Sequence, residues 1–338
     1  MFHPRLKGDY HAMGYRYGSL LARNGFKIPP QSKEYLEFGR RSEPLVEKVF
    51  PEVLDEMKGF AEGCHSPFEQ FRGFMLSIGA LRMQPACSVL AVRGSGGTLL
   101  ARNYDFFYSF KDYCESTIVR PEGAFCSVGN SDVFIGRDDG MNEKGLAVAI
   151  TGVEGKHTQP GVSFVLATRG VLDKCSSTDE GIAFLRTCRP SSAYTFTLAD
   201  RSGEMAVVEW SPRRSVVRQP PSDTDYIVAT NHFNGPGMMS MEKLEERQKS
   251  NWDSVPRYQA ITGALKQGRK SINAVKEILR DHEGSVCSHQ EEKKLGTIWS
   301  AVFDLKRLQM HLCEGHPCDT EYKIDMRLAN AVKRQQPR

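Results

Sequence analysis

The sequence lacks long uninterrupted apolar runs, and this excludes a membrane-spanning helix of the usual kind. No segment approaches the roughly 18 consecutive apolar residues that such a helix requires. The first ten residues also have no apolar core of the type found in a secretory signal peptide. We therefore expect no membrane partner and no targeting segment.

Strong charge of one sign is also missing. The net charge is only +4 over 338 residues, with both signs interspersed along the chain. Nucleic-acid-binding proteins concentrate Lys and Arg on one face, so we expect no nucleic-acid partner. The content of 25% charged and 40% apolar residues is typical of a soluble globular protein of one large or two modest domains.

Clustered cysteine pairs are absent as well. The nine cysteines form an odd, scattered set, which predicts reduced thiols and a cytoplasmic location. Cys313 and Cys318 bracket His316, but the sequence shows no second cluster of ligands for a zinc ion. We therefore predict neither a metal nor a cofactor.

The pattern of the chain changes at Cys87. Residues 9–82 are predicted to be mostly helical, most clearly at 51–63, where proline begins and glycine ends an amphipathic run. Short β-rich runs follow Cys87, and helical stretches at 162–188 and 253–282 interrupt them. This order predicts an α+β fold with largely antiparallel pairing.

Cys87 begins a predicted β-hairpin. Two apolar runs, 87–92 and 99–107, are joined by a glycine-rich link, so the second strand returns Arg102, Asn103 and Asp105 towards the thiol. A thiol needs a base or a neighbouring cation to act as a nucleophile. Alternatively, Cys87 is a small buried hydrophobic residue.

The change of pattern at Cys87 suggests a way to activate its thiol. Cleavage between Ala86 and Cys87 would free an α-amine, whose intrinsic pKa of about 7.7–8.0 suits a general base. Such a base would explain why no papain-type Cys–His–Asn signature is recognisable. We therefore predict a helical segment at 1–86 and a catalytic domain at 87–338.

Other candidate residues lie at predicted strand ends. Thr151 and Gly152 end an apolar strand, where backbone N–H groups can face an oxyanion; alternatively, the preceding polar segment is only a turn. Asn231 can donate its amide to an oxyanion or cap a turn. Arg257 precedes a predicted helix and can orient the site, bind a carboxylate or be a surface charge.

Several motifs occur in order along the chain. They are GYRYG at 14–18, GFAEG at 59–63, RNYDFF at 102–107, GMNEKGL at 140–146, TNH at 230–232 and DSVPRY at 253–258. Together they resemble the N-terminal-nucleophile (Ntn) amidases, and above all the acyl-coenzyme A:isopenicillin N acyltransferase-like family, which is related to penicillin V acylases and bile salt hydrolases. The resemblance covers nearly the whole chain.

The resemblance implies a four-layer αββα sandwich of two antiparallel sheets with a helical N-terminal segment. It implies Cys87 as nucleophile, its freed amine as base and Asp105 as the carboxylate that orients this amine. The remaining implied site residues are Arg102 and Arg257 beside the thiol, and Asn231 with the backbone of Thr151 or Gly152 as oxyanion donors.

The resemblance further implies self-cleavage before Cys87, with the two fragments remaining as a heterodimer. Ala86 departs from the glycine of the acyltransferases, and its β-carbon makes a strained backbone costlier there. The implied activity is hydrolysis or acyl transfer on linear amides, such as N-acyl amines and N-acyl amino acids, or on acyl thioesters, through acyl-Cys87. The alternative is a non-catalytic descendant that binds an acylated small molecule or a partner protein.

Overall fold

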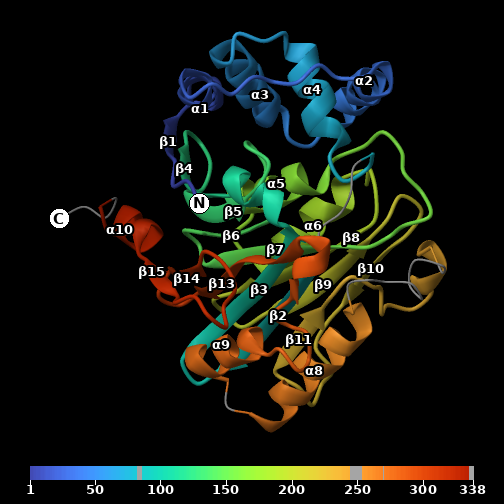
Figure 1. Ribbon diagram of the computed structural model, residues 1–338, viewed down its shortest axis with the longest axis vertical. Coiled ribbons are helices and arrows are strands. Elements are labelled where there is room, and N and C mark those ends of the chain that lie inside the picture. Colours follow the sequence, from blue (N-terminus) through green and yellow to red (C-terminus); the bar gives the residue numbers. More distant parts are fainter. Residues whose placement is uncertain (82–85, 244–252, 269, 335–338) are drawn as a thin grey trace.

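A computed structural model describes residues 1–81, 86–243, 253–268 and 270–334. Two β-sheets face each other, and helices cover both outer faces, which makes the four-layer αββα sandwich that was predicted (Figure 1). Every strand pairing is antiparallel among the described strands, apart from one at the edge of the first sheet.

The first sheet has eight strands. Its order is β1 (Arg5–Gly8), β4 (Glu115–Pro121), β5 (Ser127–Ser131), β6 (Asp139–Asn142), β7 (Leu146–Gly152), β8 (Tyr194–Asp200), β9 (Met205–Trp210) and β10 (Ser215–Arg218). The edge strand β1 pairs with β4 in parallel. The segment before Cys87, here called the leading segment, is therefore not purely helical, because it also contributes the strand β1.

The second sheet has seven strands. Its order is β11 (Tyr226–Ala229), β2 (Ala86–Gly94), β3 (Gly97–Phe107), β13 (Leu295–Asp304), β14 (Gln309–Cys313) and β15 (Lys323–Asp325), while β12 (His289–Gln290) pairs with β13. Successive side chains of a strand point to opposite faces. Val89 and Ala91 accordingly pack between the sheets, whereas Leu90 and Val92 pack under the outer helices.

Helices cover the sheets on both sides. The first sheet carries α5 (Phe164–Lys174) and α6 (Thr178–Thr187), and the second carries α8 (Ser254–Gln267) and α9 (Ile272–Arg280). The short α10 (Arg327–Lys333) follows β15. None of the described helices is long and apolar enough to span a membrane.

The leading segment adds α1 (Tyr10–Arg23), α2 (Lys33–Glu47), α3 (Pro51–Gly63) and α4 (Phe68–Ser77) on the α5 side, seen at the top of Figure 1. Glycines let α1 and α3 approach closely. A β-carbon on Gly14 would overlap the carbonyl of Glu56, and one on Gly18 would overlap that of Phe60. This contact gives the GYRYG and GFAEG motifs a packing role.

Candidate active site

The β2–β3 hairpin is confirmed and places its polar residues at one end. Cys87 lies opposite Tyr104, and Ala86 lies opposite Asp105 across the strand pair. Arg102 precedes Tyr104 by two residues on β3 and, like Cys87, has no exposed surface. The hairpin therefore gathers a thiol, a guanidinium and a carboxyl group in the protein interior.

Arg102 is fixed as a cation beside the thiol. Its Nη2 lies 2.7 Å from the Cys87 Sγ. The other arm, Nη1, donates to the Asp138 carbonyl at 2.9 Å and lies 3.4 Å from the Asp139 carboxylate. The guanidinium also lies over the Tyr104 ring, 4.8 Å from its centroid. These contacts hold the positive charge where it would stabilise a thiolate.

Asn231 and Arg257 contact the backbone of Cys87. The Asn231 Oδ1 accepts from the Cys87 backbone N–H at 2.9 Å and from the Arg257 Nη2 at 2.7 Å. The Arg257 Nη1 donates to the Cys87 carbonyl at 2.5 Å and to the Ser88 hydroxyl at 2.9 Å. Arg257 is thus a buried residue of the site and not a surface charge.

The candidate oxyanion residues lie against Asn231. Its Nδ2 donates to the Gly152 carbonyl at 2.9 Å. The hydroxyl of Thr151 donates to the Thr230 carbonyl at 2.6 Å, which ties the end of β7 to the end of β11. The structure therefore brings Asn231, Thr151 and Gly152 together beside Cys87, while their roles in the reaction stay predictions.

Asp105 is a buried carboxyl group with one unused oxygen. Its Oδ1 accepts from the Thr297 hydroxyl at 2.6 Å, whereas its Oδ2 has no hydrogen-bond partner among the described residues. Burial raises the pKa of Asp105 to about 6, although the charge of Arg257 and the Thr297 hydrogen bond oppose this shift. The Oδ2 of Asp105 can therefore accept a hydrogen bond from one more cationic donor.

The Cys87 thiol resists ionisation. Burial raises the pKa of Cys87 to about 12, with Arg102 opposing the shift and Asp105 and Asp138 adding to it. One guanidinium does not offset complete burial next to two acidic groups. Activation of this thiol therefore requires a base.

Further residues surround this core that the sequence did not single out. Tyr104 stacks on Trp299 with 3.7 Å between ring centroids and donates to the Asp132 carboxylate at 2.9 Å. Burial and the neighbouring Asp132 raise the pKa of Asp138 well above its usual range. Tyr104 belongs to the RNYDFF motif, so the sequence could have indicated it as a site residue. The residues next to Trp299 in the sequence form no motif that would indicate its place in the site.

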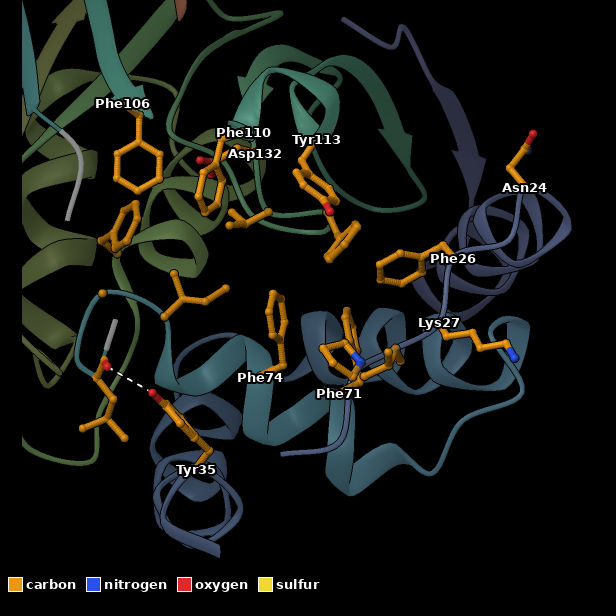
Figure 2. A pocket seen from close by; sticks show the side chains of 18 of the residues that line it. Asn24, Phe26, Lys27, Tyr35, Phe71, Phe74, Phe106, Phe110, Tyr113 and Asp132 are labelled. Atoms are coloured by element: carbon orange, nitrogen blue, oxygen red, sulfur yellow. Dashed lines mark hydrogen bonds between the residues drawn. The ribbon is translucent and has the colours of Figure 1, made fainter. Parts of the chain in front are cut away.

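An aromatic pocket of about 930 Å³ opens between the leading segment and the rest of the chain (Figure 2). One wall carries Phe26, Phe71 and Phe74, and the facing wall carries Phe106, Phe110 and Tyr113. Tyr104 and Asp132 line it too, so the pocket reaches the ring that lies against Arg102 and the carboxylate that accepts from Tyr104. Its size and apolar walls suit a small organic ligand.

This fold is that of the Ntn hydrolases. A variant of conjugated bile acid hydrolase from Clostridium perfringens matches with a TM-score of 0.51 at 15% identity, over 71% of this chain and 96% of that one. Penicillin V acylase from Agrobacterium tumefaciens matches with a TM-score of 0.46 at 18% identity, over 68% and 82%. An N-acylethanolamine-hydrolyzing acid amidase ortholog from Caenorhabditis elegans gives 0.47 at 16% identity, over 65% and 93%.

The chain belongs to the acyl-coenzyme A:6-aminopenicillanic acid acyl-transferase family, whose model matches residues 92–319. Comparison with curated proteins gives no match. The family assignment makes the protein an enzyme of the linear amide hydrolase and acyltransferase class. The matched region contains Arg102, Asp105, Asn231 and Arg257 but begins after Cys87, so the choice of nucleophile depends on the geometry described above.

Proposed function

We propose that the protein is a cysteine-nucleophile amidase or acyltransferase that forms an acyl-Cys87 intermediate. The observation that carries this proposal is the convergence of three polar side chains on one buried cysteine. Arg102 contacts its sulfur, and Asn231 and Arg257 contact its backbone. A cysteine that served only as a hydrophobic residue would gain nothing from a guanidinium at its sulfur, because burying that charge is costly.

We further propose that the Ala86–Cys87 bond is cleaved autocatalytically, which separates a leading segment (1–86) from a catalytic domain (87–338). The Cys87 sulfur attacks the Ala86 carbonyl carbon, the thiol proton passes to the Cys87 nitrogen, and the C–N bond breaks to leave a thioester and a free α-amine. Water then hydrolyses the resulting thioester to the Ala86 carboxylate and the Cys87 thiol. The unused oxygen of Asp105, opposite Ala86, supports this step because it is a suitable acceptor for the new α-ammonium.

Buried contacts would keep the two fragments together as a heterodimer. The Glu56 carboxylate lies 3.1 Å from the Arg169 guanidinium, and the Tyr10 hydroxyl donates to Asp173 at 2.9 Å. The pairing of β1 with β4 adds backbone hydrogen bonds. Both fragments also share one apolar core, so separating them would expose a large apolar surface.

In the mature enzyme, the α-amine would take the thiol proton, and the thiolate beside Arg102 would attack a carbonyl carbon. The oxyanion would accept hydrogen bonds from the Asn231 amide and from backbone N–H at Thr151 or Gly152. The α-ammonium would return its proton to the leaving amine or thiol, and water or an amine would then take the acyl group from Cys87.

The aromatic pocket supports an apolar acyl group on the substrate, such as that of an N-acyl amine, an N-acyl amino acid or an acyl thioester. All nine cysteines are free thiols in the structure, which is in keeping with a reducing compartment such as the cytoplasm.

The competing function is a non-catalytic module that binds an acylated molecule in the same pocket.

Intact-mass measurement of freshly purified protein tests the proposal. We expect one fragment ending at Ala86 and one beginning at Cys87, with a single uncleaved chain for Cys87→Ala. The matched control Cys188→Ala removes another buried thiol, at the end of α6, and should be cleaved normally. An intact wild-type chain that turns over amides at full rate would overturn the role of the freed amine. A chain that forms no acyl adduct with amides or thioesters would overturn the catalytic proposal and favour the non-catalytic binding module.

A further inference from the structure

Two loops on the α9 side of the second sheet bring together four metal-ligating side chains. They are His282, Cys287, His289 and Cys318, here called the Cys–His cluster. One nitrogen or sulfur from each lies within 4.8 Å of all the others. His282 and Cys287 lie between α9 and β12, His289 is the first residue of β12, and Cys318 lies between β14 and β15.

The distances within the cluster suit one tetrahedral ion. The His289 Nε2 lies 3.5 Å from the Cys287 sulfur and 3.2 Å from the Cys318 sulfur. With zinc–sulfur bonds of about 2.3 Å and zinc–nitrogen bonds of about 2.0–2.1 Å, a tetrahedral site separates nitrogen from sulfur by about 3.6 Å. Two thiols and two imidazoles are also the donor set that zinc prefers over calcium or magnesium.

His316 supports the cluster from outside it. Its Nδ1 lies 2.6 Å from the Nδ1 of His289, so one of the two nitrogens must donate a proton to the other. That contact holds the imidazole of His289 with Nε2 towards both sulfurs, as the outer partner of a metal-bound histidine does. The remaining Nε2 of His316 is buried and has no hydrogen-bond partner among the described residues.

The surrounding backbone joins the two loops and links them to the proposed active site. The Arg280 Nε donates to the Pro317 carbonyl at 2.8 Å, which fixes the end of α9 to the loop that carries Cys318. Ser288, between two members of the cluster, donates its backbone N–H to the Thr297 hydroxyl at 3.0 Å, and that hydroxyl donates to Asp105. Hydrogen bonds thus anchor both loops of the cluster, and the cluster lies close to Thr297, the residue whose hydroxyl donates to Asp105.

We propose that the Cys–His cluster is a structural zinc site that fastens the α9–β12 loop to the β14–β15 loop. The sequence analysis missed it, because Cys318 is separated in the sequence from His282, Cys287 and His289 by β12, β13 and β14, and only the fold brings the four together. Cys313 is not a member: its thiol lies 3.5 Å from the carbonyls of Gly315 and Thr320.

Metal analysis of the full chain tests this site. Protein purified without chelator from zinc-supplemented cells should contain about one zinc per chain, by inductively coupled plasma mass spectrometry. Cys318→Ser should lose that zinc, whereas the matched control Cys313→Ser, five residues away, should retain it. His316→Ala should weaken zinc binding by about 10–100-fold, as outer-partner substitutions do.

Cobalt provides a readout that does not depend on the folding of a variant. Wild-type protein stripped of metal should bind Co²⁺ and show the visible bands of a tetrahedral site with a sulfur-to-cobalt charge-transfer band in the near ultraviolet. Zinc should displace these bands. A reduced wild-type chain that takes up neither zinc nor Co²⁺ would overturn the site, and so would a Cys287–Cys318 disulfide that persists in the freshly purified protein. Neither result would affect the proposed role of Cys87.

Discussion

Replacing Asp105 by asparagine should stabilise the uncleaved chain, and the gain should grow with pH. Burial raises the pKa of Asp105 from 3.8 to about 6. Because its folded-state pKa is the higher one, the folded chain holds this proton more tightly than the unfolded chain does. Stability is therefore greatest at low pH, and it falls as the pH rises through the interval between the two values.

The expected size of the effect follows from that shift. A difference of about 2.2 pKa units corresponds to about 3 kcal/mol of lost stability once both states are ionised, since one unit is 1.36 kcal/mol. Between about pH 4 and pH 7 the loss should amount to about 2–2.5 kcal/mol. Asparagine does not titrate, so the Asp105→Asn chain escapes this loss.

The assay compares two uncleavable chains, Cys87→Ala and Cys87→Ala with Asp105→Asn, by urea unfolding at a series of pH values. All other titrating groups cancel in the difference between their free energies of unfolding, provided that the two m values agree. The difference should shift in favour of asparagine by about 2–2.5 kcal/mol from about pH 4 to pH 7. A difference that stays flat with pH would refute the claim that Asp105 is buried without an adequate cationic partner.

Three further substitutions address the proposed catalysis. Arg102→Lys should lower kcat/KM by roughly 10²-fold, because lysine cannot contact the thiol and Asp138 at once; Arg93→Lys, at the far end of β2, should leave turnover unchanged in the same assay. Asn231→Ala should lower kcat by about 10²–10³-fold with little change in KM, and a rise in KM alone would contradict an oxyanion role. Phe74→Ala should raise KM for apolar acyl donors about tenfold, whereas Phe2→Ala, whose side chain is 63% exposed, should not.

Local signals predicted much of the fold. The helix at 51–63 is observed with the predicted bounds, since proline, glycine and an apolar stripe agree over one short segment. The strands β5 and β6 were missed because their sequences, SVGNS and DGMN, are polar and small, yet every residue in them is buried. Gly129 shows why: a β-carbon there would overlap the Asp139 carbonyl, so close strand packing and not apolar content determines the residue type.

The site was predictable where one hairpin forms it. The spacing from Cys87 to Arg102 and Asp105 fixes their register across a glycine-rich turn, and the structure has that register. Asn231 and Arg257 could be named only as polar residues near the ends of predicted elements, with several possible roles. Thr297 has no local signal at all, since its hydroxyl reaches Asp105 only through the pairing of β13 with β3.

The energetics of the uncleaved chain bear on how the proposed enzyme would be kept inactive. The burial that raises the pKa of Cys87 also raises that of Asp105, so both groups resist ionisation for the same reason. A positive charge created at the Cys87 nitrogen would lower both pKa values at once, because opposite charges within a few ångströms favour the ionised forms. Cleavage would supply an amine that is a base while neutral and becomes that positive charge once it has taken the thiol proton. The cost of ionising the buried Asp105 carboxyl group in the precursor would thus be offset by the same reaction that activates the thiol, and the pH dependence of the Asp105→Asn chain measures that cost before any substrate is known.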